Sequence, residues 1–258
     1  MIIIAFIDDF NIEENKVLEK MKHNNYKAVA KERIKKGSLC LDLSNMKTRS
    51  TLKALEPLNL PKLDDLTFKM HEKPLRNDDK KEIIDIIKNS FPTQVKKLEI
   101  KNDETIEINY WLEVLESATQ RVKKEFCANN FSASLNTFDR TLKAFSKAVT
   151  ISMDYFTVDA TSEDLDDAEY RDFNIQKIHL SDIETAKIDD IKHIINILAR
   201  HDKLKSNLDL LYFENPQISE DANKFENEVN KHVKDKGFEK IKKATFEDVY
   251  LCNSKKFA

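Results

Sequence analysis

Glycine is scarce in this 258-residue sequence and occurs only as Gly37 and Gly237. A dinucleotide-binding turn needs three closely spaced glycines, and a phosphate-binding P-loop needs two that lie close together. The nucleophile elbow of many hydrolases needs glycines on both sides of its serine. Two glycines so far apart supply none of these motifs. The sequence therefore excludes nucleotide enzymes of these types and gives no sign of an elbow-type hydrolase.

Cysteine is also limited. Cys40, Cys127 and Cys252 are odd in number and far apart. A disulfide framework uses an even set of cysteines, so we expect free thiols and a reducing, intracellular location, with the cytoplasm as the default.

An excess of positive charge is missing as well. The chain has 43 Lys and Arg against 46 Asp and Glu, for a net charge of −3. Nucleic-acid binding needs a basic stripe, so we expect no nucleic acid partner and no charge-driven membrane binding. The apolar run MIIIAFI at residues 1–7 is too short for a membrane span and lacks the basic region of a signal peptide.

What the sequence does contain is a strand-and-helix pattern that returns along most of its length. It is clearest in residues 208–232, where Leu208, Leu211 and Phe213 follow the spacing L-x-x-L-x-L and an amphipathic helix comes next. The buried side of that helix is predicted to consist of Phe225, Val229 and Val233.

Weaker copies of this unit occur before and after it. The last core positions of the predicted strands are Leu43, Phe68, Ile100, Ala128, Met153, Leu180, Phe213 and Ala244. Successive positions are separated by roughly 25–33 residues, a spacing typical of repeat architectures. Because one strand and one helix cannot bury their own apolar faces, such repeats predict a solenoid.

The pattern resembles leucine-rich repeats of the irregular, ribonuclease-inhibitor-like class with α-helices on the outer face. The resemblance covers roughly residues 37–246. It implies an α/β fold: a curved solenoid of about seven repeats with a parallel concave sheet inside and helices outside. Residues 1–36 would then form a helical N-terminal cap, and residues 247–258 a C-terminal tail.

The sequence departs from this family in the turn that follows each strand. The family usually has Asn or Cys three residues after the last strand leucine, where it forms a ladder between repeats. Here Asn or Asp recurs one residue earlier, at Asn45, Asn102, Asn130, Asp182 and Asn215. These residues form either a shifted ladder or turns that need unusual backbone angles.

The segment 159–172 is strongly acidic, with seven carboxylates and one arginine. It stands where neighbouring repeats carry an apolar helix. It is either a solvated loop that replaces a helix or a site for a cation or a basic partner. The order of its acids does not match an EF-hand loop.

The candidate binding site consists of the strand residues that alternate with the core. Stacked strands lie about 4.8 Å apart and packed helices about 10 Å apart, so the strands would line a concave face. That face mixes charges and has no aromatic run for stacking bases, which favours a protein partner. The candidates are Thr67, Lys97, Glu99, Ser152, Lys177, His179, Leu210 and Tyr212, with Leu210 and Tyr212 as the best anchors.

No catalytic or metal-binding set stands out. The six histidines form no H-E-x-x-H motif, and the spacing of Asp190 and His193 is better explained by a solvated helix face. Cys127 has no flanking signature of a nucleophile. We therefore expect a non-catalytic protein–protein interaction scaffold, which could belong to a larger complex, and no cofactor or small-molecule substrate.

Two alternatives stay open. The first is a regulator of a small GTPase, because leucine-rich repeats of the Ran-type GTPase-activating proteins use an exposed arginine, and Arg76 precedes a predicted helix. The second is a substrate receptor of a ubiquitin ligase, although the segment before the repeats, residues 1–36, is shorter than the usual adaptor-binding motif.

Overall fold

The protein forms a single large parallel sheet whose strands follow one another in chain order. The computed structural model describes residues 39–42, 62–70, 77–90, 94–118, 121–159, 172–183, 187–214, 216–218, 221–247 and 250–251. The eight strands of this sheet are, in spatial order, β1 (Leu39–Asp42), β2 (Lys62–Met70), β3 (Gln94–Glu107), β4 (Val122–Ser134), β5 (Thr150–Asp159), β6 (Lys177–Ser181), β7 (Leu210–Glu214) and β9 (Thr245–Glu247). Every neighbouring pair is parallel.

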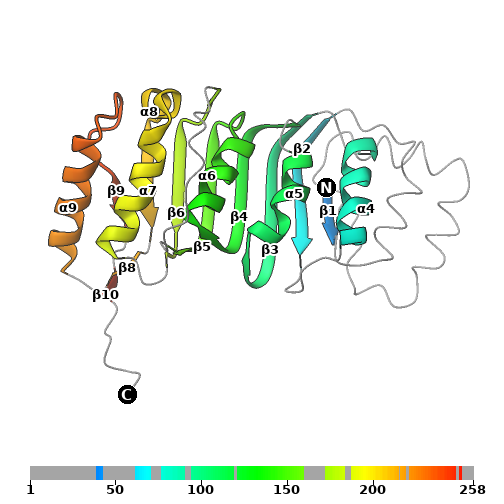
Figure 1. Cartoon of the computed structure of the whole chain (residues 1–258), viewed down its shortest axis with the longest axis horizontal. Helices are drawn as coiled ribbons and strands as arrows, with labels where there is room; N and C mark the ends of the chain where they lie inside the picture. The colour runs from blue at the N-terminus through cyan, green and yellow to red at the C-terminus, as the bar shows by residue number, and fades with distance from the viewer. Residues whose placement is uncertain are drawn as a thin grey trace, which may run out of the picture.

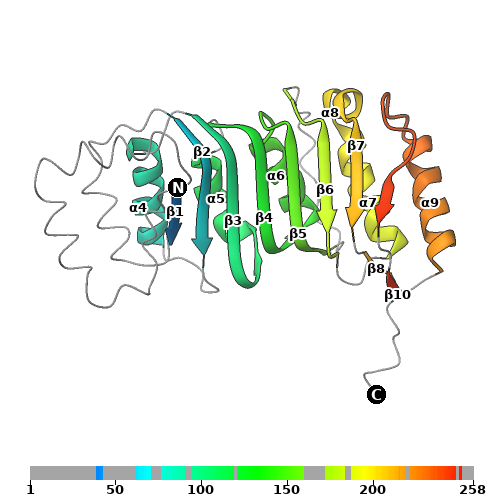
Figure 2. The same cartoon turned by 180° about the vertical axis from the view of Figure 1, so that it is seen from behind.

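The helices cover one face of this sheet. They lie in front of it in Figure 1 and behind it in the reverse view of Figure 2. Their bounds are α4 (Asn77–Ser90), α5 (Asn109–Ala118), α6 (Leu135–Ala144), α7 (Ile188–Arg200), α8 (Asp202–Asn207) and α9 (Ala222–Asp235). None of the described elements lies on the other face of the sheet, which we call the open face. The fold is therefore α/β, with all the described helices of this sheet on a single side.

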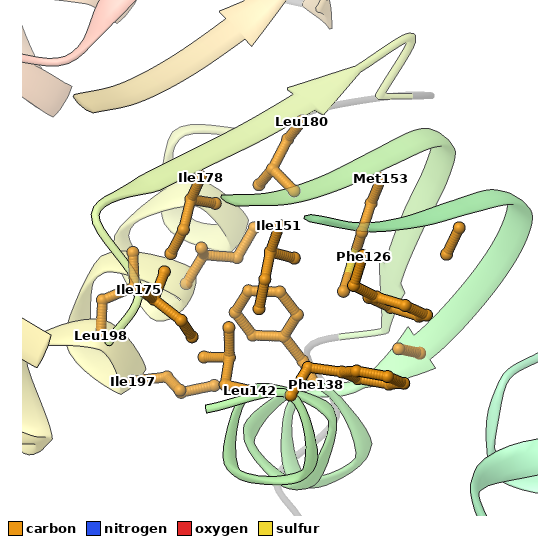
Figure 3. Packing of buried hydrophobic residues seen from close by; sticks show 14 of the residues in the cluster. Phe126, Phe138, Leu142, Ile151, Met153, Ile175, Ile178, Leu180, Ile197 and Leu198 are labelled. Carbon is orange, nitrogen blue, oxygen red and sulfur yellow. The ribbon is translucent and has the colours of Figure 1, made fainter. Parts of the chain in front are cut away.

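The core lies between the sheet and the helices because alternate strand residues point toward the helices. Two rows of side chains, at most 2% exposed, run across the strands. They are Leu66, Leu98, Phe126, Ile151, Ile178 and Leu211, and then Phe68, Ile100, Ala128, Met153, Leu180 and Phe213. Figure 3 shows how Phe138 and Leu142 of α6 and Leu198 of α7 pack beneath part of these rows.

The register places the predicted last core positions of neighbouring strands opposite one another in five of seven cases, from Phe68 through to Phe213. The first and last steps were wrong. Leu41, not Leu43, lies opposite Phe68, so the first step is slightly longer than predicted. Phe246, not Ala244, lies opposite Phe213, so the last step is longer as well. Ala244 is buried, but it precedes the strand that begins at Thr245.

Strands β3, β4 and β5 run on past the predicted strand ends. A second parallel stretch pairs Ile106 with Phe131, and Phe131 with Phe156. Asn130 lies just before this stretch with φ 60°, and Asp182 follows β6 with φ 48°. Left-handed backbone is rare for residues other than glycine, and Asn and Asp tolerate it best. The predicted unusual backbone angles are confirmed at these two positions, although Asn130 lies within β4 and not in a turn.

Local caps fix the ends of two helices. The Ser134 hydroxyl accepts a hydrogen bond from the Thr137 N–H at the start of α6, and the Asp221 carboxylate accepts one from the Lys224 N–H at the start of α9. Both are the N-cap contacts that satisfy an otherwise unpaired helix N–H. After α9 the chain turns at Gly237, whose φ of 67° explains a glycine there.

The helical layer also contains a buried polar cluster. His201, between α7 and α8, donates from Nε2 to Asp139 Oδ1 over 2.6 Å. Lys143 lies one helical turn after Asp139, with Nζ 2.8 Å from Oδ2. Burial alone would raise the pKa of Asp139, but the hydrogen bonds from His201 and Lys143 outweigh it and lower the pKa below its ordinary value. The carboxylate is thus held ionised inside the protein.

Several predictions fall outside the described residues. These are the N-terminal cap at residues 1–36, the central part of the acidic segment at residues 160–171, and Arg76.

Within the predicted tail, β10 (Tyr250–Leu251) pairs in parallel with β8 (Gln217–Ile218) as a separate two-stranded sheet, which the sequence did not predict. In the described part of the chain, no helix combines the length and apolarity that a bilayer crossing requires.

Candidate binding face

The open face displays its side chains in three rows, because parallel pairing places equivalent positions of neighbouring strands side by side. The middle row contains Thr67, Glu99, Cys127, Ser152, His179, Tyr212 and Thr245. The row nearer the strand starts contains Asp65, Lys97, Glu125, Thr150, Lys177 and Leu210. The row nearer the strand ends contains Lys69, Lys101, Asn129, Asp154, Ser181, Glu214 and Glu247.

All eight candidate residues from the sequence lie in these rows. Five are in the middle row, and Lys97, Lys177 and Leu210 are in the row before it. Sequence reasoning missed the third row, including Asp154, Glu214 and Glu247. Asp154 and Glu214 each follow a candidate residue by two positions, and alternate strand residues share a face, so extending the candidates by two positions would have found them.

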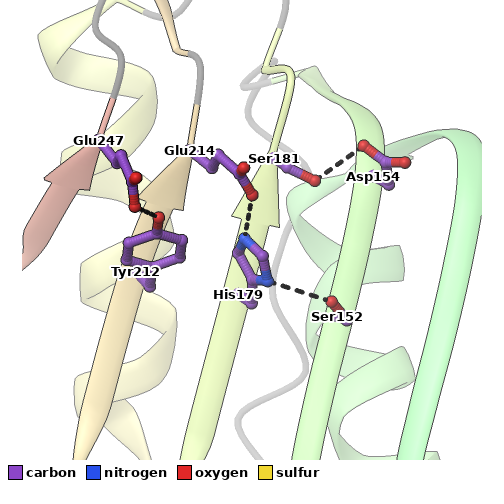
Figure 4. A network of polar contacts seen from close by, with 7 residues as sticks. All are labelled: Ser152, Asp154, His179, Ser181, Tyr212, Glu214 and Glu247. Carbon is purple, nitrogen blue, oxygen red and sulfur yellow. Dashed lines mark hydrogen bonds and ion pairs between the residues drawn. The ribbon is translucent and has the colours of Figure 1, made fainter.

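A line of hydrogen bonds connects three adjacent strands in the β5–β7 part of the face (Figure 4). Ser152 Oγ lies 3.5 Å from His179 Nδ1, and His179 Nε2 lies 2.8 Å from Glu214 Oε2. With its proton on Nε2, the neutral imidazole donates to Glu214 and accepts from the Ser152 hydroxyl. The Tyr212 ring packs beside it, with centroids 4.6 Å apart.

Two further carboxylates in this part of the face are held in the same way. The Ser181 hydroxyl donates to Asp154 Oδ1 over 2.7 Å. The Tyr212 hydroxyl donates to Glu247 on the neighbouring strand β9. Asp154, Glu214 and Glu247 are therefore each oriented by a neighbour that can donate without carrying a charge (Figure 4).

The β2–β4 part of the face is built differently. Glu99 accepts a hydrogen bond from Thr67 over 3.2 Å and also lies 3.3 Å from the ammonium of Lys101. Partial burial by itself lowers the pKa of Lys97, but the Cys127 thiol and the carboxylates of Glu125, Glu99 and Asp65 raise it overall. Positive and negative groups thus neutralise one another in this part.

Cys127 is a free thiol in the middle row, and its Sγ donates to Glu125 Oε1 over 3.3 Å. Burial raises the pKa of this thiol to about 12; the charge of Lys97 works against that rise, and Glu125 adds to it. Only the thiolate is a good nucleophile, so this cysteine is poorly suited to covalent chemistry at neutral pH.

The line from Ser152 through His179 to Glu214 has the order of a nucleophile, a base and an orienting acid. Acyl transfer also needs N–H donors aimed at the developing oxyanion. Ser152 lies within β5, which is paired with β4 on one side and β6 on the other. The backbone N–H groups of this part of β5 lie between two paired strands, so they are engaged in the sheet and are not aimed at a developing oxyanion.

No metal centre emerges from the described side chains, among which no three His, Cys, Asp or Glu groups are placed to hold an ion. The Asp190 carboxylate instead accepts from the Lys187 N–H at the start of α7, and His193 is exposed.

No model of a known protein family matches this sequence, and neither does any curated protein.

Proposed function

We propose that this chain is a non-enzymatic protein-binding scaffold, a curved leucine-rich-repeat-like solenoid that binds its partner with the open face. The observation that carries the proposal is the contrast between the two sides of one sheet. One side is buried beneath helices, and the other displays ordered rows of half-exposed polar and aromatic side chains with no described element over it.

Spacing supports the curved form. Neighbouring strands lie about 4.8 Å apart, whereas packed helices need about 10 Å between their axes. A sheet with helices on one side only must bend to meet both distances, with its strands on the inside. The register repeats at steps of roughly 25–33 residues, each with one strand, and such steps suit a solenoid of this class.

The side chains of the open face favour a protein as the partner. Tyr212 is an aromatic residue with a polar tip, the kind of side chain that anchors protein interfaces. Leu210 lies beside Lys177 in the next row and adds apolar surface. The described residues of this face form no basic stripe for phosphate groups. The free Cys127 thiol suits a reducing, intracellular compartment.

The test is capture of partners by the immobilised full chain from a native cell extract, with quantification by mass spectrometry. A triple variant of the open face, Glu99→Ala, Lys177→Ala and Tyr212→Ala, should lose the partner. A matched triple variant of exposed helix residues, Glu113→Ala, Asn227→Ala and Lys231→Ala, should retain it. Equal retention by both variants would rule out the open face as the binding surface.

A further inference from the structure

Negative charge is distributed unevenly over the open face. Within the three rows, the β2–β4 part has three described carboxylates and three lysines, which are Asp65, Glu99, Glu125, Lys69, Lys97 and Lys101. Within the same rows, the β5–β9 part has three described carboxylates and one lysine, which are Asp154, Glu214, Glu247 and Lys177. The charges of these row residues cancel in the first part and sum to −2 in the second, with His179 neutral.

The carboxylates of the second part are also fixed in direction. Asp154 and Glu247 each accept a hydroxyl hydrogen bond, and Glu214 accepts one from His179. None of the ion pairs in the described part of the chain joins any of the three to a lysine or an arginine. Their charge is therefore available to a cation that arrives from outside, and the cost of ordering them is already met.

We infer that the β5–β9 part of the open face binds an extended, basic segment of a partner protein, with arginine or lysine side chains on Asp154, Glu214 and Glu247. This inference rests on the proposed function and names the chemistry of the partner. Charge complementarity supports this inference, because a segment with alternating cations supplies the positively charged partners that these three carboxylates lack.

Geometry sets the length of the segment. From β5 to β9 the sheet order runs through three strand spacings, which amounts to about 14 Å. An extended chain advances about 3.3 Å per residue and repeats its side-chain direction every second residue, so about four to six residues cross this distance. Arginine suits such sites because its guanidinium can bind a carboxylate through two parallel hydrogen bonds. The exposed part of the Tyr212 ring adds a surface on which a cation can rest.

Two other ligands fit less well. The phosphates of a nucleic acid would be repelled by the same carboxylates. A single metal ion needs its oxygen ligands within about 2.6 Å, whereas Asp154 and Glu214 come from strands two positions apart. A protein segment is the ligand that can contact all three residues at once.

The test uses fluorescence anisotropy with the full chain and a labelled probe peptide, Gly-Ser-Arg-Ser-Arg-Ser-Arg-Ser-Gly. We expect saturable binding that weakens as salt rises. The triple variant Asp154→Asn, Glu214→Gln, Glu247→Gln should bind the probe roughly tenfold more weakly or worse. The matched control Asp65→Asn, Glu99→Gln, Glu125→Gln changes the net charge equally but should bind within about twofold of wild type if attraction is local.

Three outcomes would overturn the inference. The first is that the probe does not bind, and the second is displacement of the probe by millimolar Ca²⁺ at constant ionic strength. The third is equal weakening of probe binding in both triple variants, which would mean nonspecific attraction between polyions. Amide replacements keep a hydrogen-bond acceptor, and thermal unfolding checks that each variant folds. If one triple variant does not fold, Glu214→Gln alone should still weaken the probe measurably more than Glu99→Gln alone, and the reverse order would also contradict the inference.

Partner capture separates this inference from the proposed function. If the Tyr212-containing triple variant loses a partner that the carboxylate triple variant retains, the open face binds that partner by other chemistry, and only the inference fails. If neither triple variant changes capture, the proposed function fails as well.

Discussion

The two faces of the sheet carry opposite kinds of side chain on the same strands. On β7, Leu211 and Phe213 are fully buried against the helices, whereas Leu210, Tyr212 and Glu214 are partly exposed on the open face. Along the covered face each strand from β2 to β7 contributes an apolar residue to each of the two buried rows. Along the open face the chemistry changes from strand to strand. Burial therefore fixes the covered face, and the open face is where the sequence can vary to suit a partner.

The largest effect should come from removing a core side chain on β7. Phe213→Ala should lower the free energy of unfolding by about 3–5 kcal/mol, because it deletes a fully buried ring and leaves a cavity. Its neighbour on the other face provides the control. Tyr212→Ala should cost less than about 1 kcal/mol, which is typical away from the core. Urea unfolding of both variants measures the difference, and similar losses would mean that the faces are assigned wrongly.

A loss near the lower end of that range should follow from Asp139→Asn in the helical layer. The change leaves His201 and Lys143 without the carboxylate that they share, and breaking a buried pair of this kind costs about 3 kcal/mol or more. Urea unfolding at neutral pH measures it. A loss of stability smaller than that of a surface substitution would mean that this cluster does not stabilise the folded protein.

The same residue predicts a pH dependence. Because the pKa of Asp139 is lowered in the folded protein, its contribution is complete above the unfolded value of about 3.9 and is lost as pH falls through the lower folded value. Wild type should therefore lose more stability than Asp139→Asn as the pH falls below about 4. Parallel loss in both proteins would show that other groups control acid unfolding.

A smaller effect than that of Phe213→Ala or Asp139→Asn should come from Ser181→Ala, on the open face. Ser181 is 7% exposed, and its hydroxyl orients Asp154, so we expect a loss of about 1 kcal/mol. The matched control is Ser152→Ala, whose hydrogen bond to His179 is longer and whose effect should be smaller. Thermal unfolding of the two variants shows which loses more stability. A larger loss for Ser152→Ala would contradict the hydrogen bonds described for these two residues.

Much of the fold could be predicted because the pattern that specifies it is local. The alternation around Leu211 and Phe213, followed by the apolar face of α9, identifies a strand and a helix from neighbouring residues alone. The errors occurred where the pairing between strands decides which residue lies opposite its neighbour. Leu39, Leu41 and Leu43 alternate equally well, and only the register with β2 shows that Leu41 is the residue opposite Phe68.

The candidate face was predicted only in part for the same reason. Its residues follow from alternation, but their contacts join positions far apart in the chain, such as His179 with Glu214 and Tyr212 with Glu247. The second parallel stretch of β3–β5 likewise depends on neighbouring strands rather than on its own sequence. A single sequence carries no signal for such pairs until the register is known.

Hydroxyl-radical footprinting of the full chain, free and bound to its captured partner, tests the role of the open face most directly. We predict that the partner protects Tyr212, His179 and Leu210 from oxidation and leaves exposed side chains of α7 and α9 unchanged. Protection confined to the helices, with unchanged oxidation at Tyr212, would contradict the account.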